Sequence, residues 1–249
     1  MELIVLGAGP AYTDRPGALG AAYLLRMEGG ALLLDLGQGA FPALVAQIPP
    51  ETLDGIVISH LHPDHFIDLV ALRHYLRYQF RPPRRLTVHA PAALADRIDA
   101  LHGEPGFTAA VLDLAPLAPG ERRVGRFVVQ AARVTHTDDS YGFRVAPEGG
   151  GPGLVYSGDC GVAGDLRPLV REGDALLSEV SFGAEPVPGD ALHLNAPAVG
   201  DLAATTRAGR VLLTHIQMGF DRQAALDAVR AAYPGPVEFV DPGTRIRLD

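Results

Sequence analysis

The six residues from 60 to 65, His-Leu-His-Pro-Asp-His, constrain this chain more than any other feature of its sequence. They follow an apolar run that predicts a β-strand. Alternate residues of an extended segment share a face, so His60 and His62 can bind one ion. The proline begins a helix, which presents Asp64 and His65 to a neighbouring ion. Imidazole and carboxylate ligands suit zinc, with manganese second; the alternative is a polar helix N-terminus in which Asp64 binds first-turn amides.

Three more residues of ligand type stand at the ends of apolar runs. His136 closes a predicted strand at 127–134, and Asp159 and His215 each follow directly on another strand. One such residue alone is most often a hydrogen-bonded structural group. Because all three occur in a chain that already carries the first cluster, we interpret them as further metal ligands.

The apolar runs predict two sheets packed face to face with helices outside, because consecutive strands open the chain and strands then alternate with helices. Predicted strands lie at 3–6, 21–27, 31–36, 55–59, 86–89, 126–136, 141–145, 154–157, 175–180, 211–214, 237–240 and 246–248. Predicted helices lie at 64–80, 91–101, 196–208 and 221–232. No linker or internal repeat divides the chain, so we expect one domain over residues 1–249.

The composition excludes several classes of function. The chain has no lysine, which excludes a phosphate-binding loop ending in Gly-Lys and also Schiff-base chemistry. The single cysteine, Cys160, excludes an internal disulfide and a cysteine-based zinc finger. A net charge of −8 argues against a broad nucleic-acid surface. No apolar run approaches the roughly 20 residues of a membrane span and no signal peptide is recognisable, so we expect a cytoplasmic protein with no membrane partner.

Together the motif at 60–65, His136, Ser-Gly-Asp159 and Thr-His215 resemble the metallo-β-lactamase-fold hydrolases, in the family's order and over nearly the whole chain. The resemblance implies a four-layer αββα sandwich with the site on one edge. It also implies two divalent ions, zinc first and manganese second. It assigns one ion to His60, His62 and His136, the other to Asp64, His65 and His215, and makes Asp159 the bridge between them.

The charge of such a site favours a phosphate ester as the substrate. Two divalent ions carry four positive charges, and Asp64, Asp159 and a bridging hydroxide remove three, which leaves about one. An anionic diester is attracted to that charge. Two ions about 3.5–4 Å apart also lower the pKa of a shared water and clamp the attacking and leaving oxygens. We therefore expect a metal-dependent hydrolase in which a metal-activated hydroxide attacks phosphorus.

Two further residues resemble the ribonuclease Z branch of the family: Glu179 in Ser-Glu-Val after a strand, and His193 in His-Leu-Asn before a helix. In ribonuclease Z such a Glu orients a His that steadies the transition state or protonates the leaving oxygen. The candidate catalytic residues are therefore Asp64, His193 and Glu179. Ribonuclease Z typically has His-Ser-Thr where this chain has His-Leu-Asn. The alternative is a surface histidine beside a helix that Asn195 caps.

The spacing between two candidate ligands bears on the size of the substrate. Ribonuclease Z enzymes that bind tRNA carry a long Gly/Pro-tipped arm between the third His motif and the bridging Asp, but only 22 residues separate His136 from Asp159. Bacterial cyclic-nucleotide phosphodiesterases of this fold lack the arm and are similar to this chain at 59–68, 156–160 and 212–216. We expect a small phosphodiester substrate, with a 3′,5′-cyclic nucleotide such as cyclic AMP first.

Three other functions stay open. The first is a ribonuclease Z-like endonuclease that processes tRNA 3′ ends, which the missing arm and the net charge of −8 disfavour. The second is a thioesterase or lactonase, because two zinc ions polarise a carbonyl equally well. The third is a non-catalytic nucleic-acid-binding relative, although such relatives usually lose metal ligands and all seven positions are filled here.

A basic and aromatic helix face follows the metal motif. Arg73, Arg77 and Arg81 are spaced by four residues, with Tyr75 and Tyr78 beside them. Such a face can bind nucleotide or RNA phosphates. It is more typical of a solvated or dimer-forming surface. We expect a homodimer through this helix.

The remaining conspicuous residues are assigned to structure. We interpret Asp35 as a residue that hydrogen-bonds backbone near the site, Cys160 as a packed thiol, and the loop 7–20 as a segment that folds over the metal cleft. That loop begins Gly-Ala-Gly but lacks the third glycine of a dinucleotide-binding motif. The histidines that match no motif position are His74, His89 and His102.

Overall fold

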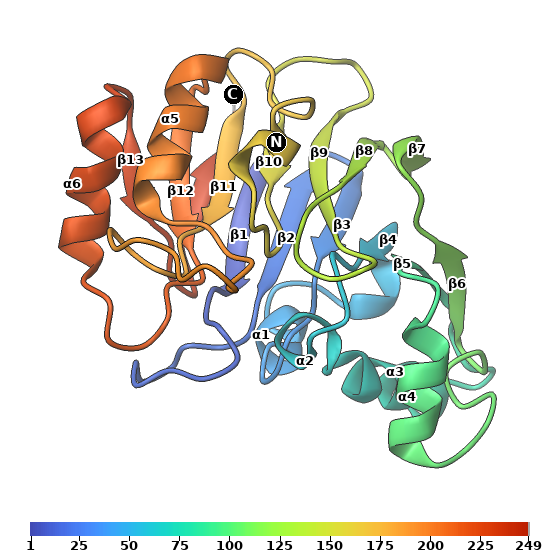
Figure 1. Cartoon of the computed structure of the whole chain (residues 1–249). Coiled ribbons are helices and arrows are strands. Elements are labelled where there is room, and N and C mark those ends of the chain that lie inside the picture. The colour runs from blue at the N-terminus through green and yellow to red at the C-terminus, as the bar shows by residue number, and fades with distance from the viewer. Residues whose placement is uncertain (249) are drawn as a thin grey trace.

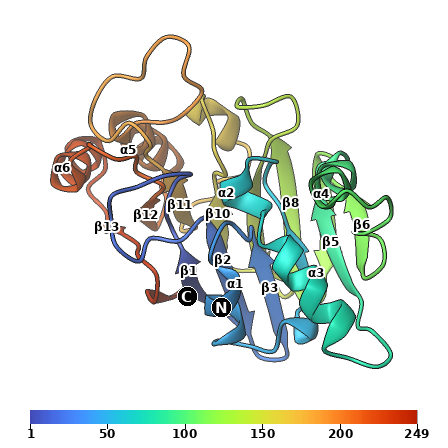
Figure 2. The same ribbon diagram turned by 90° about the horizontal axis from the view of Figure 1, so that it is seen from below.

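Two β-sheets pack face to face, and helices cover their outer faces, in the computed structural model, which describes residues 1–248 (Figures 1 and 2). The first sheet runs in the order β14 (Arg245–Arg247), β1 (Glu2–Gly7), β2 (Ala22–Met27), β3 (Gly30–Leu34), β4 (Gly55–Val57), β5 (Leu86–Ala90) and β6 (Leu112–Pro116). The second runs in the order β13 (Val237–Phe239), β12 (Arg210–Thr214), β11 (Ala175–Glu179), β10 (Leu154–Tyr156), β9 (Tyr141–Pro147), β8 (Phe127–Arg133) and β7 (Gly120–Val124).

The helices lie in two groups on the outer faces. The α-helices are α1 (Phe41–Val45), α2 (Pro63–Phe66), α3 (Leu69–Tyr78), α4 (Leu94–His102), α5 (Ala196–Thr206) and α6 (Arg222–Ala232), and the 3-10 helices are η1 (Pro50–Thr52) and η2 (Ala163–Leu166). Helices α1, α3 and α4 bury apolar side chains against the first sheet, and α5 and α6 against the second. The predicted four-layer αββα sandwich is therefore confirmed.

The core between the two sheets holds the molecule together. It contains large aromatic side chains from both sheets, among them Tyr23, Phe127, Phe143 and Tyr156, each at most 1% exposed. Burying one such side chain contributes about 1.5–3 kcal/mol. Strands from both halves of the chain share this core, which supports the single domain predicted for residues 1–249; that organisation stays a prediction.

Parallel pairing brings the candidate site residues to one edge. In the second sheet β10 pairs in parallel with β11, and β11 with β12. In the first sheet β3 pairs in parallel with β4. The residues that follow the carboxyl ends of parallel strands meet at one edge of a sheet, where α/β proteins usually place their ligands. The strand ends Leu34, Val57, Tyr156, Glu179 and Thr214 thus deliver the site.

One predicted helix is wrong in its extent. The segment 64–80 forms two helices, α2 and α3, rather than one. Asp68 explains the break, because its backbone N–H donates to Leu36 O at 3.1 Å and its carboxylate accepts from Phe41 N at 2.8 Å. These contacts with the neighbouring loop replace helical hydrogen bonds. They cannot be predicted from the local sequence pattern.

Strands β6 and β7 and helix α1 were not predicted, and β8 is shorter than predicted. The unpredicted β6 and β7 are the outer strands of their sheets, with polar residues that interrupt any apolar run, and α1 is only five residues long. Strand β8 ends at Arg133, so His136 does not close it as predicted but lies in the following loop. A backbone hydrogen bond from Val134 N to Ser140 O closes that loop.

Within residues 1–248, none of the helices combines the length and the hydropathy that crossing a membrane requires. The cytoplasmic location expected from the sequence stays a prediction.

Candidate metal centre

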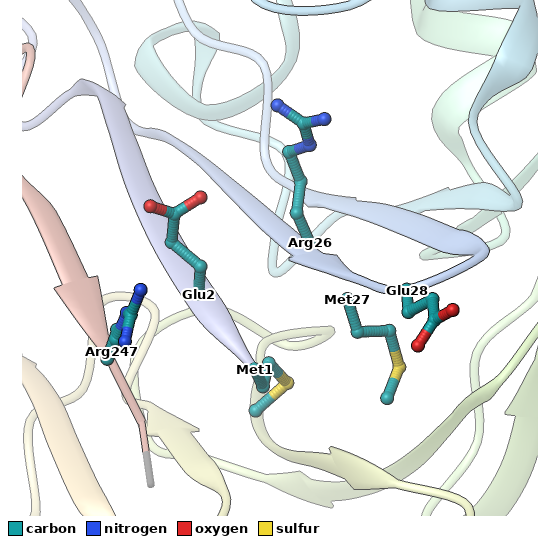
Figure 3. A pocket seen from close by; sticks show the side chains of 6 residues that line it. All are labelled: Met1, Glu2, Arg26, Met27, Glu28 and Arg247. Atoms are coloured by element: carbon teal, nitrogen blue, oxygen red, sulfur yellow. The ribbon is translucent and has the colours of Figure 1, made fainter.

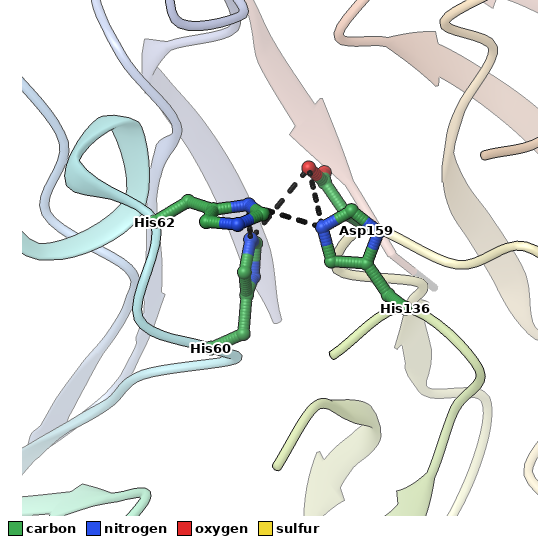
Figure 4. A group of neighbouring side chains, drawn as sticks. All are labelled: His60, His62, His136 and Asp159. Atoms are coloured by element: carbon green, nitrogen blue, oxygen red, sulfur yellow. Dashed lines mark hydrogen bonds and ion pairs between the residues drawn. The ribbon is translucent and has the colours of Figure 1, made fainter. Parts of the chain in front are cut away.

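Four of the predicted ligands form a first group at the sheet edge. Figure 4 shows His60, His62, His136 and Asp159 directed toward one another from three separate segments. One ligand atom from each lies within 4.8 Å of all the others. The nitrogens approach closely: His62 Nδ1 is 3.0 Å from His60 Nε2 and 3.1 Å from His136 Nε2. The histidine pair comes from the extended segment after β4, as its alternating spacing predicts.

A second group contains Asp64, His65, Asp159 and His215, again with ligand atoms within 4.8 Å of one another. Pro63 is the first residue of α2, and it places the next two residues in the helix's first turn. His215 Nε2 lies 3.3 Å from His65 Nε2 and 3.2 Å from Asp64 Oδ2. Asp159 belongs to both groups, and the structure thus brings all seven predicted ligand residues together.

The hydrogen-bonding state of these groups fits a divalent cation. His136 donates from Nδ1 to Leu192 O at 2.7 Å, and His65 from Nδ1 to Asp35 at 2.7 Å, so the other nitrogen of each ring presents a lone pair. Lone pairs facing one another repel unless a cation lies between them. The buried oxygen Asp159 Oδ1 accepts no hydrogen bond from the described part of the chain. Both observations are typical of a metal site.

The pKa shifts show what charge each group favours. In the first group burial lowers the pKa of His60 and of His62, which keeps these rings neutral. In the second group burial also lowers the pKa of His215, but the carboxylates of Asp159 and Asp64 together outweigh it, and the pKa rises. Burial raises the pKa of Asp159, yet the surrounding imidazoles, His215 first, hold it well below its usual range. The second group thus favours added positive charge, which a metal ion supplies.

Asp35 holds His65 of the second group in place. Its carboxylate accepts from Ser59 N at 2.6 Å, Ser59 Oγ at 2.7 Å, Tyr156 Oη at 2.7 Å and His65 Nδ1. The backbone contact expected of Asp35 is confirmed, but its larger role is to hold the imidazole of His65. The sequence did not single out Tyr156, because a Tyr within an apolar strand reads as core. Asp35 itself is recognisable as the polar residue that ends a Leu-rich run.

The predicted pair His193 and Glu179 lies beside both groups. His193 Nδ1 is 2.9 Å from Glu179 Oε1, which also accepts from Cys160 N at 2.8 Å. Burial lowers the pKa of His193, but the hydrogen bond to Glu179 and the negative charges of Glu179 and Asp159 together outweigh it, and the pKa is raised. Asn195 accepts from Ala198 N and caps α5, so the capping role and the His193–Glu179 contact occur together.

Ser181 is a buried residue that sequence reasoning missed. Its hydroxyl contacts Glu179, His193 and His215. A serine two positions after a strand carries no pattern of its own, and only the tertiary structure reveals it.

The face predicted to carry three arginines is neither wholly helical nor wholly solvated, which corrects the sequence interpretation. Helix α3 ends at Tyr78, so Arg81 lies beyond it. Arg73 is 4% exposed: its guanidinium lies 3.7 Å above the Phe107 ring, and its Nε donates to Phe107 O at 2.9 Å. Arg77 and Arg81 are exposed, as expected. The ring of Phe107 supplies a partner from a distant loop that helix periodicity cannot show.

The residues assigned to structure lie where they were expected. Cys160 is fully buried, and burial raises the pKa of its thiol to about 12. Among residues 1–248, the unmatched histidines, His74, His89 and His102, belong to none of the ligand groups.

The loop after β1 lies against the His215 segment. His215 N donates to Ala8 O at 3.0 Å, and Arg15 Nη2 donates to Ile216 O at 2.5 Å. A hollow of about 640 Å³ lies elsewhere, at the opposite end of β1 and β2 (Figure 3). It is lined by Met1, Glu2, Arg26, Met27, Glu28 and Arg247, which include no histidine or cysteine. We therefore place the candidate catalytic site at the sheet edge that carries the two His/Asp groups.

Known proteins are similar to this chain in sequence. A family model described as the beta-lactamase superfamily domain matches residues 33–216. Protein ML1173 of Mycobacterium leprae is 31% identical, over 98% of this chain and 87% of its own length. The probable metallo-hydrolase YhfI of Bacillus subtilis is 26% identical over 87% of both chains.

Solved structures agree with the sequence comparisons. The crystal structure of YhfI superposes with a TM-score of 0.86 at 22% identity and covers 98% of both chains, which shows the shared fold. The short form of human tRNase Z superposes with a TM-score of 0.75 at 25% identity and covers all of both chains. The resemblance expected from the motifs is confirmed: the chain belongs to the β-lactamase superfamily and has the metallo-β-lactamase fold of metallo-hydrolases.

Proposed function

We propose that this protein is a metal-dependent phosphodiesterase that hydrolyses a small diester, with a 3′,5′-cyclic nucleotide as the leading substrate. The observation that carries the proposal is the His193–Glu179 pair beside two His/Asp groups that share Asp159. Such a pair can supply a proton to the alkoxide that leaves when a phosphodiester is hydrolysed.

The two groups assign the ions. His60, His62, His136 and Asp159 would hold one divalent ion, and Asp64, His65, His215 and Asp159 the other, with zinc preferred by the ligand types. When bound, such ions polarise phosphoryl oxygens and acidify a water molecule. Asp64 serves this chemistry as a ligand.

His193 supplies the proton that the leaving oxygen needs. The carboxylate of Glu179 accepts from Nδ1, so Nε2 is the nitrogen left for the substrate. The hydrogen bond to Glu179 raises the pKa of His193 against the opposing effect of burial. The imidazolium therefore persists to higher pH, and its Nε2–H can donate to the alkoxide as the P–O bond breaks. In this account His193 is the catalytic residue and Glu179 positions it.

Exposed apolar side chains near the site residues in sequence support a substrate with an apolar part. Three large apolar side chains near the site residues in sequence are 43–48% exposed: Val162, Leu192 and Met218. Val162 lies three residues after Asp159, Leu192 directly precedes His193, and Met218 lies three residues after His215. Phe182 adds a ring 6.2 Å from that of His193. Such side chains suit the faces of a nucleobase better than the backbone of a polyanion.

The segment between His136 and Asp159 supports a small substrate rather than a folded RNA. It is filled by β9, β10 and the turn between them. A tRNA-binding arm has no place there, and the net charge of −8 offers little general attraction for RNA. The similarity to human tRNase Z is the observation that favours tRNA 3′ processing as the second candidate.

One comparison tests the proposal against that second candidate. A single zinc-loaded preparation is assayed with 3′,5′-cyclic AMP and with a precursor tRNA, and His102→Ala, which changes a histidine outside the ligand groups, serves as the matched control. We expect cyclic AMP to be opened to a monophosphate by the wild type and by His102→Ala. A clear preference for the precursor tRNA, or no hydrolysis of any diester, would contradict the proposal.

A further inference from the structure

Ser181 connects the two parts of the candidate site. It lies two residues after β11, and it is fully buried. Its Oγ is hydrogen-bonded to Glu179 Oε2, and it lies 3.2 Å from His215 Nδ1 and 3.3 Å from His193 Nδ1. One hydroxyl thus lies between a candidate metal ligand and the candidate acid pair.

The direction of each hydrogen bond follows from the groups involved. A carboxylate and a carbonyl oxygen only accept, and Glu179 Oε2 lies nearer to Ser181 Oγ than His215 O does at 3.2 Å, so the single hydroxyl proton of Ser181 is donated to Glu179. His215 directs Nε2 into the second ligand group, so its ring proton is on Nδ1. Within residues 1–248, Ser181 Oγ is the one acceptor placed at that nitrogen. His215 therefore donates to Ser181, and Ser181 donates to Glu179.

We propose that Ser181 is a positioning residue that fixes the tautomer and orientation of His215 and joins this ligand to the Glu179–His193 pair. The inference rests on the proposed function and deepens it. One carboxylate then orients two imidazoles: Glu179 acts on His193 directly and on His215 through the serine hydroxyl. Hydrogen bonds of this kind to metal-ligating histidines set their orientation and basicity.

The backbone around Ser181 is held independently of its hydroxyl. Ser181 N donates to Glu179 Oε2 at 3.2 Å, and Gln217 N donates to Ser181 O at 3.2 Å. An alanine at this position keeps both contacts. The hydroxyl can therefore be removed without removing the turn.

The matched control is Ser178→Ala. Ser178 is equally buried and lies three residues earlier, on β11. In the described chain its hydroxyl hydrogen-bonds only to the backbone oxygen of Glu179, at 3.0 Å. Both variants delete a buried hydroxyl beside Glu179, but only Ser181→Ala deprives His215 of its acceptor.

The test measures zinc affinity by competition with a chromophoric chelator, which requires no substrate. We expect Ser181→Ala to weaken the binding of one zinc ion about 10- to 100-fold, the usual effect of losing such a hydrogen bond. Ser181→Thr, which retains a hydroxyl, should restore the affinity, and Ser178→Ala should bind zinc as the wild type does. With cyclic AMP, zinc-saturated Ser181→Ala should show a lower kcat and an unchanged KM.

Two results would overturn the inference: native zinc affinity in Ser181→Ala, or an equal loss in Ser178→Ala, which would indicate a packing effect. The proposed function fails separately. If the wild type cleaves no phosphodiester but Ser181→Ala still loses zinc affinity, the substrate assignment is wrong and the role of Ser181 toward His215 stands.

Discussion

At the scale of single residues, the site depends on how two imidazoles are oriented by carboxylates. Asp35 holds His65 and Glu179 holds His193, with contacts of 2.7 and 2.9 Å. A buried carboxylate that accepts a hydrogen bond from one ring nitrogen of a histidine directs the opposite nitrogen. The first imidazole is thereby directed toward the second ligand group and, in the proposed function, the second is directed toward the substrate.

Replacing His193 tests its role as the acid. We expect His193→Ala to retain its metal ions and its fold, because the seven ligand residues are unchanged, and to lower kcat by about 10²-fold or more. The loss should be smaller for a chromogenic diester whose leaving group needs no proton. Steady-state kinetics on cyclic AMP and on bis(p-nitrophenyl) phosphate, with metal content determined in parallel, provide the measurement. Equal activity of variant and wild type on cyclic AMP would show that His193 is not the acid and is a surface residue beside the helix.

The ligand residues could be predicted from the sequence because their types are distinctive where they stand. A histidine or aspartate at the end of an apolar run is distinctive, and His136, Asp159 and His215 were predicted in this way. Tyr156 and Ser181 were not, because their roles depend on partners 121 and 34 residues away. A hydroxyl that orients a ligand has no local signature.

At the scale of elements, short loops anchored by carboxylates set the positions of the helices. The loop after α4 is an example: Asp99 accepts from Gly106 N at 2.6 Å, Thr108 N at 2.8 Å and Thr108 Oγ1 at 2.6 Å. These contacts hold the loop that carries Phe107, the ring on which Arg73 of α3 stacks. The two helices are thus connected through one carboxylate.

Asp99→Asn tests this anchoring and its pH dependence. Burial raises the pKa of Asp99, but the hydrogen bonds, those from Thr108 first, outweigh it and the pKa is lowered. Its contribution to stability is therefore present above the unfolded-state pKa of about 3.9 and is lost as the pH falls through the lower folded value. We expect Asp99→Asn to lower the free energy of unfolding by about 1–2 kcal/mol at neutral pH, and by progressively less below about pH 4.

Urea unfolding at neutral pH and at about pH 3 provides the measurement, with Glu104→Gln, an exposed carboxylate of the same loop, as the control. The control should lie within about 0.5 kcal/mol of the wild type. A difference for Asp99→Asn that does not depend on pH would show that the charge of Asp99 is not what anchors the loop.

Elements with strong periodicity could be predicted, and those decided by tertiary contacts could not. The predicted segments 196–208 and 221–232 correspond to α5 and α6, because an apolar stripe faces the second sheet along their length. The break between α2 and α3 depends on Asp68 and a loop nearly thirty residues earlier in the chain. Strands β6 and β7 lie at sheet edges, where one face is open to polar residues.

At the scale of the whole molecule, the site joins the two sheets. The first sheet supplies His60, His62 and His65 through the segment after β4, and the second supplies Asp159 and His215 through the ends of β10 and β12. Ligands from both sheets can meet one ion, so metal binding should stabilise their packing. The homodimer expected through α3 stays a prediction, and of its face Arg77 and Tyr78 are exposed.

Zinc should therefore stabilise the folded chain in a pH-dependent manner. At free zinc about 100-fold above the dissociation constant, one site adds about 2.7 kcal/mol to the free energy of unfolding. Ligand imidazoles must be neutral, so protons compete with zinc, and the stabilisation should shrink as the pH falls below about 6.5. Thermal unfolding of chelator-treated protein with and without zinc, at several pH values and with calcium as the control, measures this. A zinc effect no larger than that of calcium would contradict it.

The most direct test of the account is anomalous diffraction at the zinc absorption edge from crystals of the wild-type chain grown with zinc. The account predicts two anomalous peaks, one among His60, His62, His136 and Asp159 and the other among Asp64, His65, Asp159 and His215. In His215→Ala the second peak should weaken while the first remains. A map with no peak at either group, from protein that is folded and zinc-saturated in solution, would contradict it.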